Sequence, residues 1–460
     1  MIFRNVLLRS GALLSSVVFF SGALSAQSWP TDSAVKAAMQ QRLASKPGVG
    51  IVVATMEKGR PAKIVTAGSS GSKAALDGNT VFEIGSVTKV FTTALLADMV
   101  RRGEVRLDDP VSKYLPPTVR VPSRGGKQIT LLDLATQSSG LPRLPNNFKP
   151  ADMTNPYADY SVQQLYDFLS AYQLTRDIGS QFEYSNLGVG LLGHVLSLRA
   201  GKTYEALVTE RILTPLEMHD THVVFTPEMR EHLATGHDAT GVVVANWDLP
   251  TLAGAGALRS TANDMAKFLA ANLDSMSGPV GRALATAHVP LRDAERQMRI
   301  GLGWFTLSQF GTPIVWHNGQ TGGYHSFIGF DQANARGIVI LTNYGASVDD
   351  IGMHVLDARF PVVPPPREHK EITINAAMLD AYVGVYQLAP NFEISITKEG
   401  SSLFAQATAQ PKFQIFPESE SDFFFKVVDA QISFMKNPAG KVDQLVLHQG
   451  GANIPGSRVR

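Results

Sequence analysis

The order of β-rich and helical segments constrains the fold of this 460-residue chain more than any other feature. Two β-rich runs, at residues 50–56 and 62–68, flank a turn with glycine and proline, which predicts an antiparallel hairpin. Further helices and strands follow: helices are predicted at residues 131–137, 162–172, 187–200, 204–212 and 262–273, and strands at 301–307, 312–316, 324–330 and 337–341. Antiparallel strands from both ends can form one sheet on which the helical section packs. We therefore expect an α/β domain, an antiparallel sheet with a helical subdomain, over residues 28–360.

The C-terminal part of the chain differs in composition. Residues 361–370 contain four prolines and are expected to form a stiff linker. Beyond it, residues 371–460 consist of short β-rich runs at regular spacing. This pattern predicts a small all-β domain, either a barrel or a sandwich.

Residues 1–26 have the pattern of a secretory signal peptide. Arg4 and Arg9 precede an apolar run at 11–20, and small residues lead up to Ala26. The apolar run is shorter than the roughly 20 residues that a membrane span needs. We expect cleavage after Ala26, no stable membrane anchor afterwards, and a periplasmic or secreted location in a bacterium. An uncleaved N-terminal anchor is the alternative.

Composition excludes several classes of function. With 41 basic and 40 acidic residues, the chain has no electrostatic footprint for nucleic acid or an anionic membrane surface. It has no cysteine, which excludes disulfides, lipidation at cysteine and thiolate metal sites. The histidine pairs 219/222 and 232/237 lack a His-Glu-x-x-His helix or a carboxylate cluster at ligand spacing. We expect neither a metal nor a cofactor.

A candidate nucleophile stands at the start of a strongly apolar helix. Ser86 and Lys89 precede the run 90–100, which is apolar nearly all round and therefore predicted to be buried. Residues three apart share a helix face, so the Ser86 hydroxyl and the Lys89 amine can meet. A serine hydroxyl needs a base to become a good nucleophile, and a desolvated lysine can lose its charge and act as that base.

The same Ser-x-x-Lys spacing occurs at three other places, which we interpret as unrelated to catalysis. Ser33–Lys36 lies on a predicted surface helix, and Ser70–Lys73 lies in a glycine- and serine-rich loop, so both pairs are expected to be solvated. Ser433–Lys436 falls in a predicted strand, where residues three apart point to opposite faces.

A second candidate motif is Tyr184-Ser185-Asn186, where a loop meets the predicted helix at 187–200. A tyrosine near a lysine can be held partly deprotonated or can relay a proton. Asn186 has both donor and acceptor groups for a substrate amide. The alternative is a purely structural role, in which Ser185 or Asn186 caps the helix.

A third motif, His317-Asn318-Gly319-Gln320, is placed at the end of a predicted strand. Glycine there would let a substrate backbone lie close to the strand edge, and a free backbone N–H could serve an oxyanion hole. His317 is expected to be either a hydrogen-bond donor or a positive charge facing a substrate carboxylate.

Together and in this order, Ser86–Lys89, Tyr184-Ser185-Asn186 and His317-Asn318-Gly319 resemble the penicillin-recognising serine hydrolases. The resemblance is to class C β-lactamases, DD-carboxypeptidases and the family VIII-type esterases of that β-lactamase-like fold. It covers nearly all of residues 30–345 and includes the segments 107–110, 129–136, 259–265, 301–304 and 321–324.

The resemblance implies a role for each residue of the three motifs. Ser86 would be acylated, Lys89 would assist its deprotonation, and Tyr184 would shuttle protons and activate water for deacylation. Asn186, His317, Asn318, Gly319 and Gln320 would bind substrate, with the backbone N–H groups of Ser86 and Gln320 forming the oxyanion hole. The implied reaction is attack on a β-lactam or D-Ala-D-Ala-type amide, followed by hydrolysis of the acyl-enzyme.

One residue departs from the class C pattern, because His317 stands where those enzymes carry a lysine. A neutral imidazole would hold a substrate carboxylate less strongly than lysine does. A carboxylesterase, a penicillin-binding protein with little turnover, and a binding module with a silent hydrolase fold are the alternatives. The strand-rich C-terminal part resembles a lipocalin-like domain, which in relatives can assist assembly, so a homo-oligomer is an expected partner.

Overall fold

The computed structural model describes residues 29–43, 46–274, 278–295, 298–363, 369–389, 392–408, 412–426, 430–449 and 452–460. The signal peptide predicted for residues 1–26 lies outside these ranges, as do the central prolines of the predicted linker. None of the helices in the described part of the chain has the length and apolar character of a membrane span.

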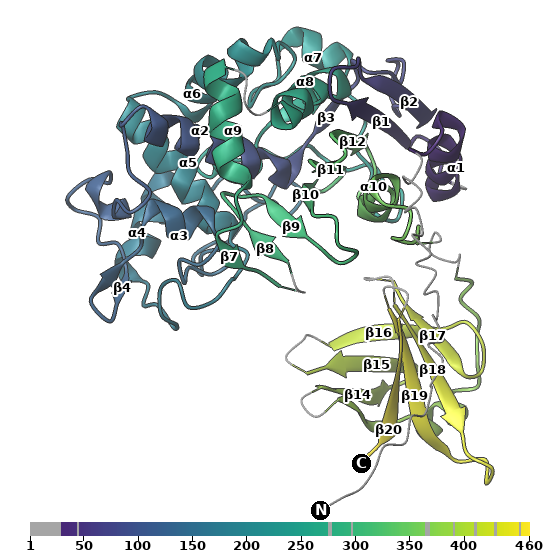
Figure 1. The fold of residues 1–460 in the computed structure, drawn as a ribbon. Helices are drawn as coiled ribbons and strands as arrows, with labels where there is room; N and C mark the ends of the chain where they lie inside the picture. The colour runs from purple at the N-terminus through teal and green to yellow at the C-terminus, as the bar shows by residue number, and fades with distance from the viewer. Residues whose placement is uncertain are drawn as a thin grey trace, which may run out of the picture.

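An eight-stranded antiparallel sheet is the centre of the first domain (Figure 1). Its order is β2 (Lys63–Gly68), β1 (Gly50–Glu57), β12 (Arg336–Thr342), β11 (His325–Asp331), β10 (Ile314–Gln320), β9 (Phe305–Leu307), β8 (Arg299–Ile300) and β7 (Arg292–Asp293). The N-terminal hairpin pairs with the last long strand, β1 with β12, as expected from the strands at both ends of the region. The predicted α/β fold is therefore confirmed.

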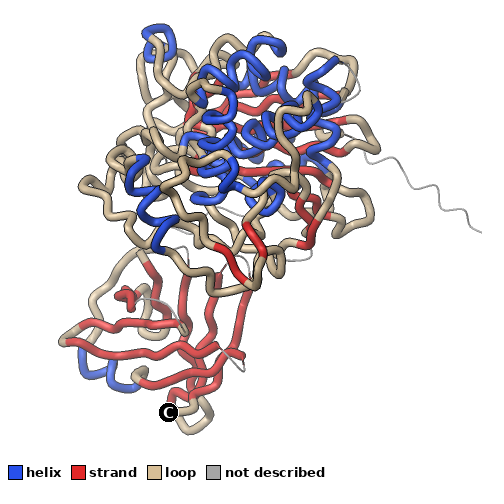
Figure 2. The backbone as a smooth tube through the Cα atoms, turned by 90° about the vertical axis from the view of Figure 1, so that its left-hand side faces the viewer, coloured by secondary structure: helices blue, strands red, loops and turns tan. Residues whose placement is uncertain are grey.

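Different helices cover the two faces of the sheet, so β1 is buried on both sides (Figures 1 and 2). Ile51 and Val53 pack with α1 (Asp32–Leu43) and α10 (Asp349–Leu356). Val52 and Ala54 face the larger core that includes α2 (Thr88–Arg101) and α8 (Ala262–Leu273). The alternation follows from the two-residue period of a strand.

The other elements form the helical section and its connections. The helices are α3 (Leu131–Ala135), α4 (Val162–Ala171), α5 (Asn186–Ala200), α6 (Tyr204–Val208), α7 (Pro227–Glu231) and α9 (Gly278–His288). The short strands are β3 (Val81–Glu83) with β6 (Arg259–Thr261) and β4 (Ser123–Arg124) with β5 (Lys127–Gln128). Side-chain caps begin several of these helices: Thr130 starts α3, Ser161 starts α4 and Thr261 starts α8.

Two predicted strands differ from the structure by several residues at one end, while those predicted at 324–330 and 337–341 differ by one residue at each end. The strand expected at 301–307 begins only at Phe305, because Gly303 adopts φ +75° and turns the chain. The strand expected at 312–316 runs on to Gln320, since β10 pairs with β11 along its whole length. His317 therefore lies inside β10, and the motif 317–320 forms the C-terminal end of this strand, as predicted.

The C-terminal strands close into a barrel, the first of the two predicted alternatives (Figure 1). In order they are β13 (Gly384–Ala389), β14 (Phe392–Glu399), β15 (Ser402–Ala407), β16 (Lys412–Pro417), β17 (Asp422–Phe425), β18 (Ala430–Lys436), β19 (Val442–Gln449) and β20 (Ala452–Arg458). The barrel has its own apolar core, in which Tyr382 stacks on Phe434 at 4.5 Å between ring centroids. Side chains thus pack its interior, as in other eight-stranded barrels.

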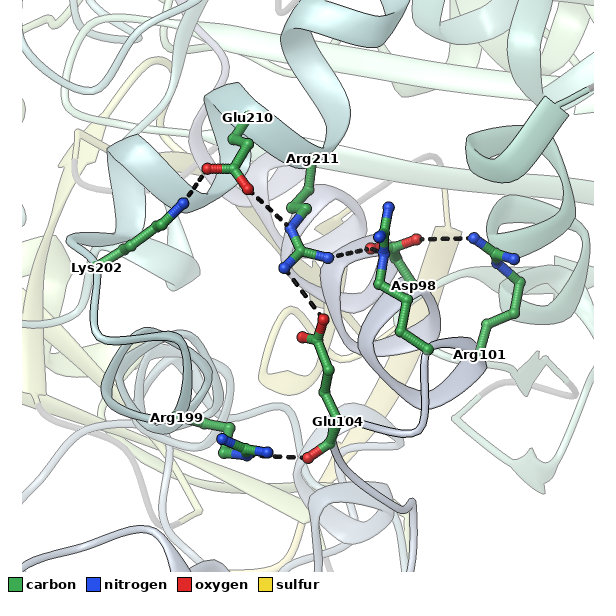
Figure 3. A network of polar contacts seen from close by, with 8 residues as sticks. Asp98, Arg101, Glu104, Arg199, Lys202, Glu210 and Arg211 are labelled. Carbon is green, nitrogen blue, oxygen red and sulfur yellow. Dashed lines mark hydrogen bonds and ion pairs between the residues drawn. The ribbon is translucent and has the colours of Figure 1, made fainter.

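A network of charged side chains surrounds the C-terminal end of α2 (Figure 3). Asp98, 1% exposed, accepts a hydrogen bond from Arg102 Nε at 2.7 Å and lies 3.4 Å from the Arg101 guanidinium. Arg211 bridges Asp98 and Glu104 at 3.3 and 3.1 Å. The network fixes the end of α2 that lies farthest along the helix from Ser86.

Candidate active site

Ser86 lies in a short 3₁₀ turn, Gly85–Val87, between β3 and α2. Gly85 has φ +48°, and a Cβ atom there would lie 2.7 Å from the backbone nitrogen of Gln320. Only glycine fits both the backbone conformation and this close approach to β10. The turn leaves Ser86 partly exposed, whereas its neighbours Gly85 and Val87 are buried.

Lys89 lies one turn into this segment with its amine fully buried. Nζ is 2.9 Å from Ser86 Oγ, 2.9 Å from Asn186 Oδ1 and 2.6 Å from the carbonyl oxygen of Ala255. Burial, followed by the positive charge of Arg143, holds the pKa of Lys89 well below its usual value. A neutral amine has two N–H donors for the two oxygens of Asn186 and Ala255, which leaves its lone pair facing the Ser86 hydroxyl.

Tyr184 faces both residues. Its ring centroid is 5.0 Å from Lys89 Nζ, and its hydroxyl hydrogen-bonds with Ser86. Burial raises the pKa of Tyr184 to about 12, against smaller lowering effects of that hydrogen bond and of Arg143. At neutral pH the phenol is therefore protonated, and the expectation that a nearby lysine holds it partly deprotonated is wrong for this state of the site.

Of the two residues after Tyr184, Ser185 has the capping role and Asn186 contacts the candidate base. Ser185 caps α5, since its Oγ accepts a hydrogen bond from the Gly188 N–H at 2.8 Å. Asn186, the first residue of α5, is not the cap: its Oδ1 accepts from Lys89, and its Nδ2 donates to Tyr157 Oη at 3.1 Å. Asn186 thus holds the amine in place whatever it does for a substrate.

His317 is 1% exposed and points to the same side of β10 as the nucleophile turn. Its ring centroid lies 6.3 Å from that of Tyr184, and its Nδ1 is 2.6 Å from the carbonyl oxygen of Asn318. Burial, followed by the charge of Lys89, lowers the pKa of His317 to about 3. The imidazole is neutral at neutral pH, so the alternative in which it presents a positive charge to a carboxylate is wrong.

Gly319 allows a close contact between β10 and the nucleophile turn, whereas the sequence predicted a close contact with a substrate backbone. A Cβ atom there would lie 2.0 Å from the Ile84 carbonyl oxygen and 2.9 Å from the Ser86 nitrogen. The glycine thus lets the protein's own backbone, rather than a substrate, lie against β10. Together with the Gly85–Gln320 approach, this contact brings the backbones of Ser86 and Gln320 close to one another, as an oxyanion hole requires.

The side chains of Asn318 and Gln320 point away from Ser86. Asn318 Nδ2 donates to Asp349 Oδ2 at 2.6 Å, on α10 and on the other face of the sheet. Gln320 Nε2 donates to the Gly345 carbonyl at 3.0 Å. The side chain of Asn318 therefore lies away from Ser86, which corrects the prediction that it contacts substrate there.

The other three Ser-x-x-Lys pairs lack this arrangement. Ser33 and Lys36 are both exposed on α1. Ser70 is buried rather than solvated, because it donates to the Ala74 carbonyl at 2.6 Å inside its loop, while Lys73 is exposed. Ser433 donates to Asp422 on the neighbouring strand of the barrel. Among the residues that the structure describes, no three histidine or carboxylate groups are placed to hold a metal ion.

Three participants could not be found from local patterns in the sequence. The Ala255 carbonyl and Tyr157 hold the Lys89–Asn186 pair, and Arg143 lies over the ring of Tyr184 with Cζ 5.1 Å from its centroid. They come from segments far apart in the sequence, and no spacing links them to Ser86. The one feature of the sequence that could have pointed to Arg143 is its position directly after residues 139–142, which contain a glycine and a proline.

An antiparallel sheet flanked by helices, with a serine–lysine pair at the start of a buried helix, defines the β-lactamase-like class of folds. The family model described as Beta-lactamase matches residues 35–359, and the chain therefore belongs to this family. Residues 368–456 match a second model, described as a domain of unknown function, DUF3471.

Similar proteins agree with this assignment. The D-alanyl-D-alanine-carboxypeptidase/endopeptidase AmpH of Escherichia coli K12 is 31% identical over 57% of this chain and 71% of its own length. A β-lactamase of Pseudomonas fluorescens is 26% identical over 68% of this chain and 92% of its own. The octameric penicillin-binding protein homologue from Pyrococcus abyssi has the same fold, with a TM-score of 0.62 and 21% identity over 92% of this chain and 99% of its own.

Gly319 gives a prediction about how closely β10 must approach the nucleophile turn. In Gly319→Ala the new methyl group collides with the backbone of Ile84, which cannot swing aside, so the turn carrying Ser86 should shift. A displacement near 1 Å lowers kcat/KM by about 10- to 100-fold. The rate of acylation in single-turnover experiments measures the loss.

The control for this variant is Gly311→Ala, at a glycine with φ +93° and open space around its Cα. That substitution introduces backbone strain without touching the site, so we expect reduced stability and an unchanged acylation rate. An acylation rate in Gly319→Ala equal to that of the wild type would show that the close approach is unnecessary.

Proposed function

We propose that the protein is a serine hydrolase that acts through an acyl-enzyme on Ser86. The observation that carries the proposal is the position of Lys89 Nζ, 2.9 Å from Ser86 Oγ, with its two other contacts made to carbonyl oxygens. A buried neutral amine placed in this way is a general base for the serine hydroxyl.

In the proposed acylation, Ser86 Oγ attacks the substrate carbonyl and its proton passes to Lys89. Tyr184, which starts protonated, gives its proton to the leaving nitrogen or oxygen as the scissile bond breaks. The backbone N–H groups of Ser86 and Gln320 donate to the oxyanion.

In the proposed deacylation, the Tyr184 phenolate takes a proton from water, and the hydroxide attacks the acyl carbonyl. Lys89 returns its proton to Ser86 Oγ as the ester bond breaks. At the end of this proposed cycle Lys89 is again neutral and Tyr184 is again protonated.

We propose β-lactam or D-Ala-D-Ala-type peptide amides as the substrates, supported by what the names of the E. coli and P. fluorescens relatives say of those proteins. A carboxylester is the second candidate. The neutral state of His317 favours it, since no cation on β10 is available to hold the carboxylate of a β-lactam or peptide.

The proposed organisation is a signal peptide at 1–26, a hydrolase domain at 28–360, a linker at 361–370 and a C-terminal domain at 371–460. The proposed boundary between the two domains is supported by the end of α10 at Leu356 and by the first C-terminal element, a 3₁₀ helix at Ala376–Ala381. We propose export to the periplasm or exterior. We also propose that the C-terminal domain assists homo-oligomer formation, with the octameric P. abyssi homologue as support.

The test follows the intact mass of the mature protein with labelled benzylpenicillin and with p-nitrophenyl esters. We expect an adduct on Ser86 that is absent in Ser86→Ala and unchanged in Ser33→Ala, a surface serine of another Ser-x-x-Lys pair. A transient penicillin adduct supports amide turnover, and a persistent one supports a penicillin-binding protein. Ester hydrolysis without a penicillin adduct supports the esterase, and activity retained in Ser86→Ala would overturn the mechanism.

A further inference from the structure

The loop that carries Arg143 is fastened to the start of α5. The Arg143 carbonyl accepts a hydrogen bond from the Leu187 N–H at 3.2 Å, and Ser185 Oγ donates to the Pro142 carbonyl at 2.6 Å. Arg176 also donates to the Leu141 carbonyl, at 3.4 Å. The backbone of Arg143 is therefore held beside Asn186 and Tyr184, two members of the candidate site.

The Arg143 side chain faces the site from the solvent. Its guanidinium carbon is 5.1 Å from the ring centroid of Tyr184, and the residue is exposed. Among the ion pairs in the described part of the chain, none includes Arg143, and Glu183, next to Tyr184 in the sequence, is paired with Arg176. Its N–H donors are thus available to a ligand.

Arg143 supplies the permanent positive charge next to the nucleophile. Burial lowers the pKa of Lys89 well below its usual value and that of His317 to about 3, so neither is a permanent cation. A guanidinium keeps its charge at all accessible pH values and can bind a carboxylate through two parallel hydrogen bonds. Its exposure means that a carboxylate could reach it without being buried first.

We propose that Arg143 is a specificity-determining residue that binds a carboxylate of the substrate. The proposal rests on the proposed hydrolase function. It adds that an acidic substrate is held by the loop before α5 rather than by β10. The carboxylate can belong to the acyl part or to the leaving part of the substrate, and matched substrates distinguish the two.

The test compares Arg143→Ala and Arg143→Lys with Arg120→Ala, an exposed arginine outside the site. Each protein receives two kinds of substrate pair. For the leaving part these are benzylpenicillin with its methyl ester, and diacetyl-L-Lys-D-Ala-D-Ala with its C-terminal amide. For the acyl part they are p-nitrophenyl succinate and p-nitrophenyl butyrate.

We expect Arg143→Ala to lower kcat/KM by about 10- to 100-fold, mainly through KM, for the carboxylate member of at least one pair, because a bidentate charged hydrogen bond is lost. The neutral member should change by less than about threefold, Arg143→Lys should lose less, and Arg120→Ala should match the wild type. Equal losses for charged and neutral members would overturn the proposal, because Arg143 would then act only through the electrostatics of Lys89 and Tyr184.

A binding experiment keeps this proposal separate from that of hydrolysis. In the unreactive Ser86→Ala protein, calorimetry should detect binding of benzylpenicillin, of diacetyl-L-Lys-D-Ala-D-Ala or of succinate monoesters, and the added Arg143→Ala substitution should abolish it. No difference between the two proteins overturns the role of Arg143, even if the wild type hydrolyses its substrates. A wild type that forms no adduct on Ser86 overturns hydrolysis, while the binding data still decide the role of Arg143.

Discussion

Replacing Lys89 with methionine is expected to lower the rate of acylation at Ser86 by about 10²- to 10⁴-fold, the range that a general base contributes. Methionine is similar in length and keeps the buried volume filled, but it cannot accept the serine proton. The measurement is the rate at which the acyl-enzyme appears by rapid-quench mass spectrometry with an ester or a penicillin.

The pH dependence of the wild type provides a second readout of the same role. Lys89 must be neutral to act as base, and its pKa lies well below the usual value. Acylation should therefore fall as the pH drops through that lowered pKa, and this limb should be missing from the residual activity of Lys89→Met. Tyr184, with a pKa of about 12, should cause no loss on the alkaline side until the pH approaches that value.

Lys36→Met is the matched control, because Lys36 belongs to the exposed Ser-x-x-Lys pair on α1. Its acylation rate and pH profile should match those of the wild type. A Lys89→Met protein that folds, as judged by its thermal unfolding, and acylates at the wild-type rate would exclude Lys89 as the base.

Removing the carboxylate of Asp98 should cause the largest loss of stability among single substitutions in the charged network of Figure 3. Asp98 is almost fully buried and contacts Arg101, Arg102 and Arg211. Asp98→Ala leaves the partly buried Arg211 without one of its partners, and breaking a buried ion pair costs about 3 kcal/mol. Urea unfolding followed by circular dichroism measures the change in the free energy of unfolding.

Asp108→Ala is the control, since Asp108 pairs with Arg106 at 2.9 Å but both side chains are at least 70% exposed. A surface pair of this kind contributes less than about 1 kcal/mol. If the two variants lost the same stability, burial would not be what makes the network at the end of α2 important.

Much of the fold could be predicted because it depends on patterns of short range. The short apolar run of β1 and the continuous apolar character of α2 follow directly from their sequences. The bounds of α8 were predicted correctly, since Thr261 caps it through a local hydrogen bond to the Asp264 N–H. The extent of β10 was missed because its pairing with β11, rather than its own composition, continues the strand to Gln320.

The charge states in the site were harder to predict than its members. The neutral His317 and the protonated Tyr184 depend on burial by distant segments, which no spacing reveals. For the same reason the carbonyl of Ala255 was not expected, although it provides the shortest contact to Lys89. A backbone oxygen carries no side-chain signature in the sequence.

The two glycines at the nucleophile turn limit how substrate preference can diverge on this scaffold. Gly85 and Gly319 hold the turn and β10 at backbone contact, so enlarging that wall would displace Ser86 as well. Arg143 is carried by a loop attached to α5 by a few hydrogen bonds, and its side chain is exposed rather than packed against the nucleophile turn. Engineering for a different substrate charge is therefore best directed at the exposed side chains of this loop, Arg143 and Asn146, rather than at its buried residues or at the two glycines.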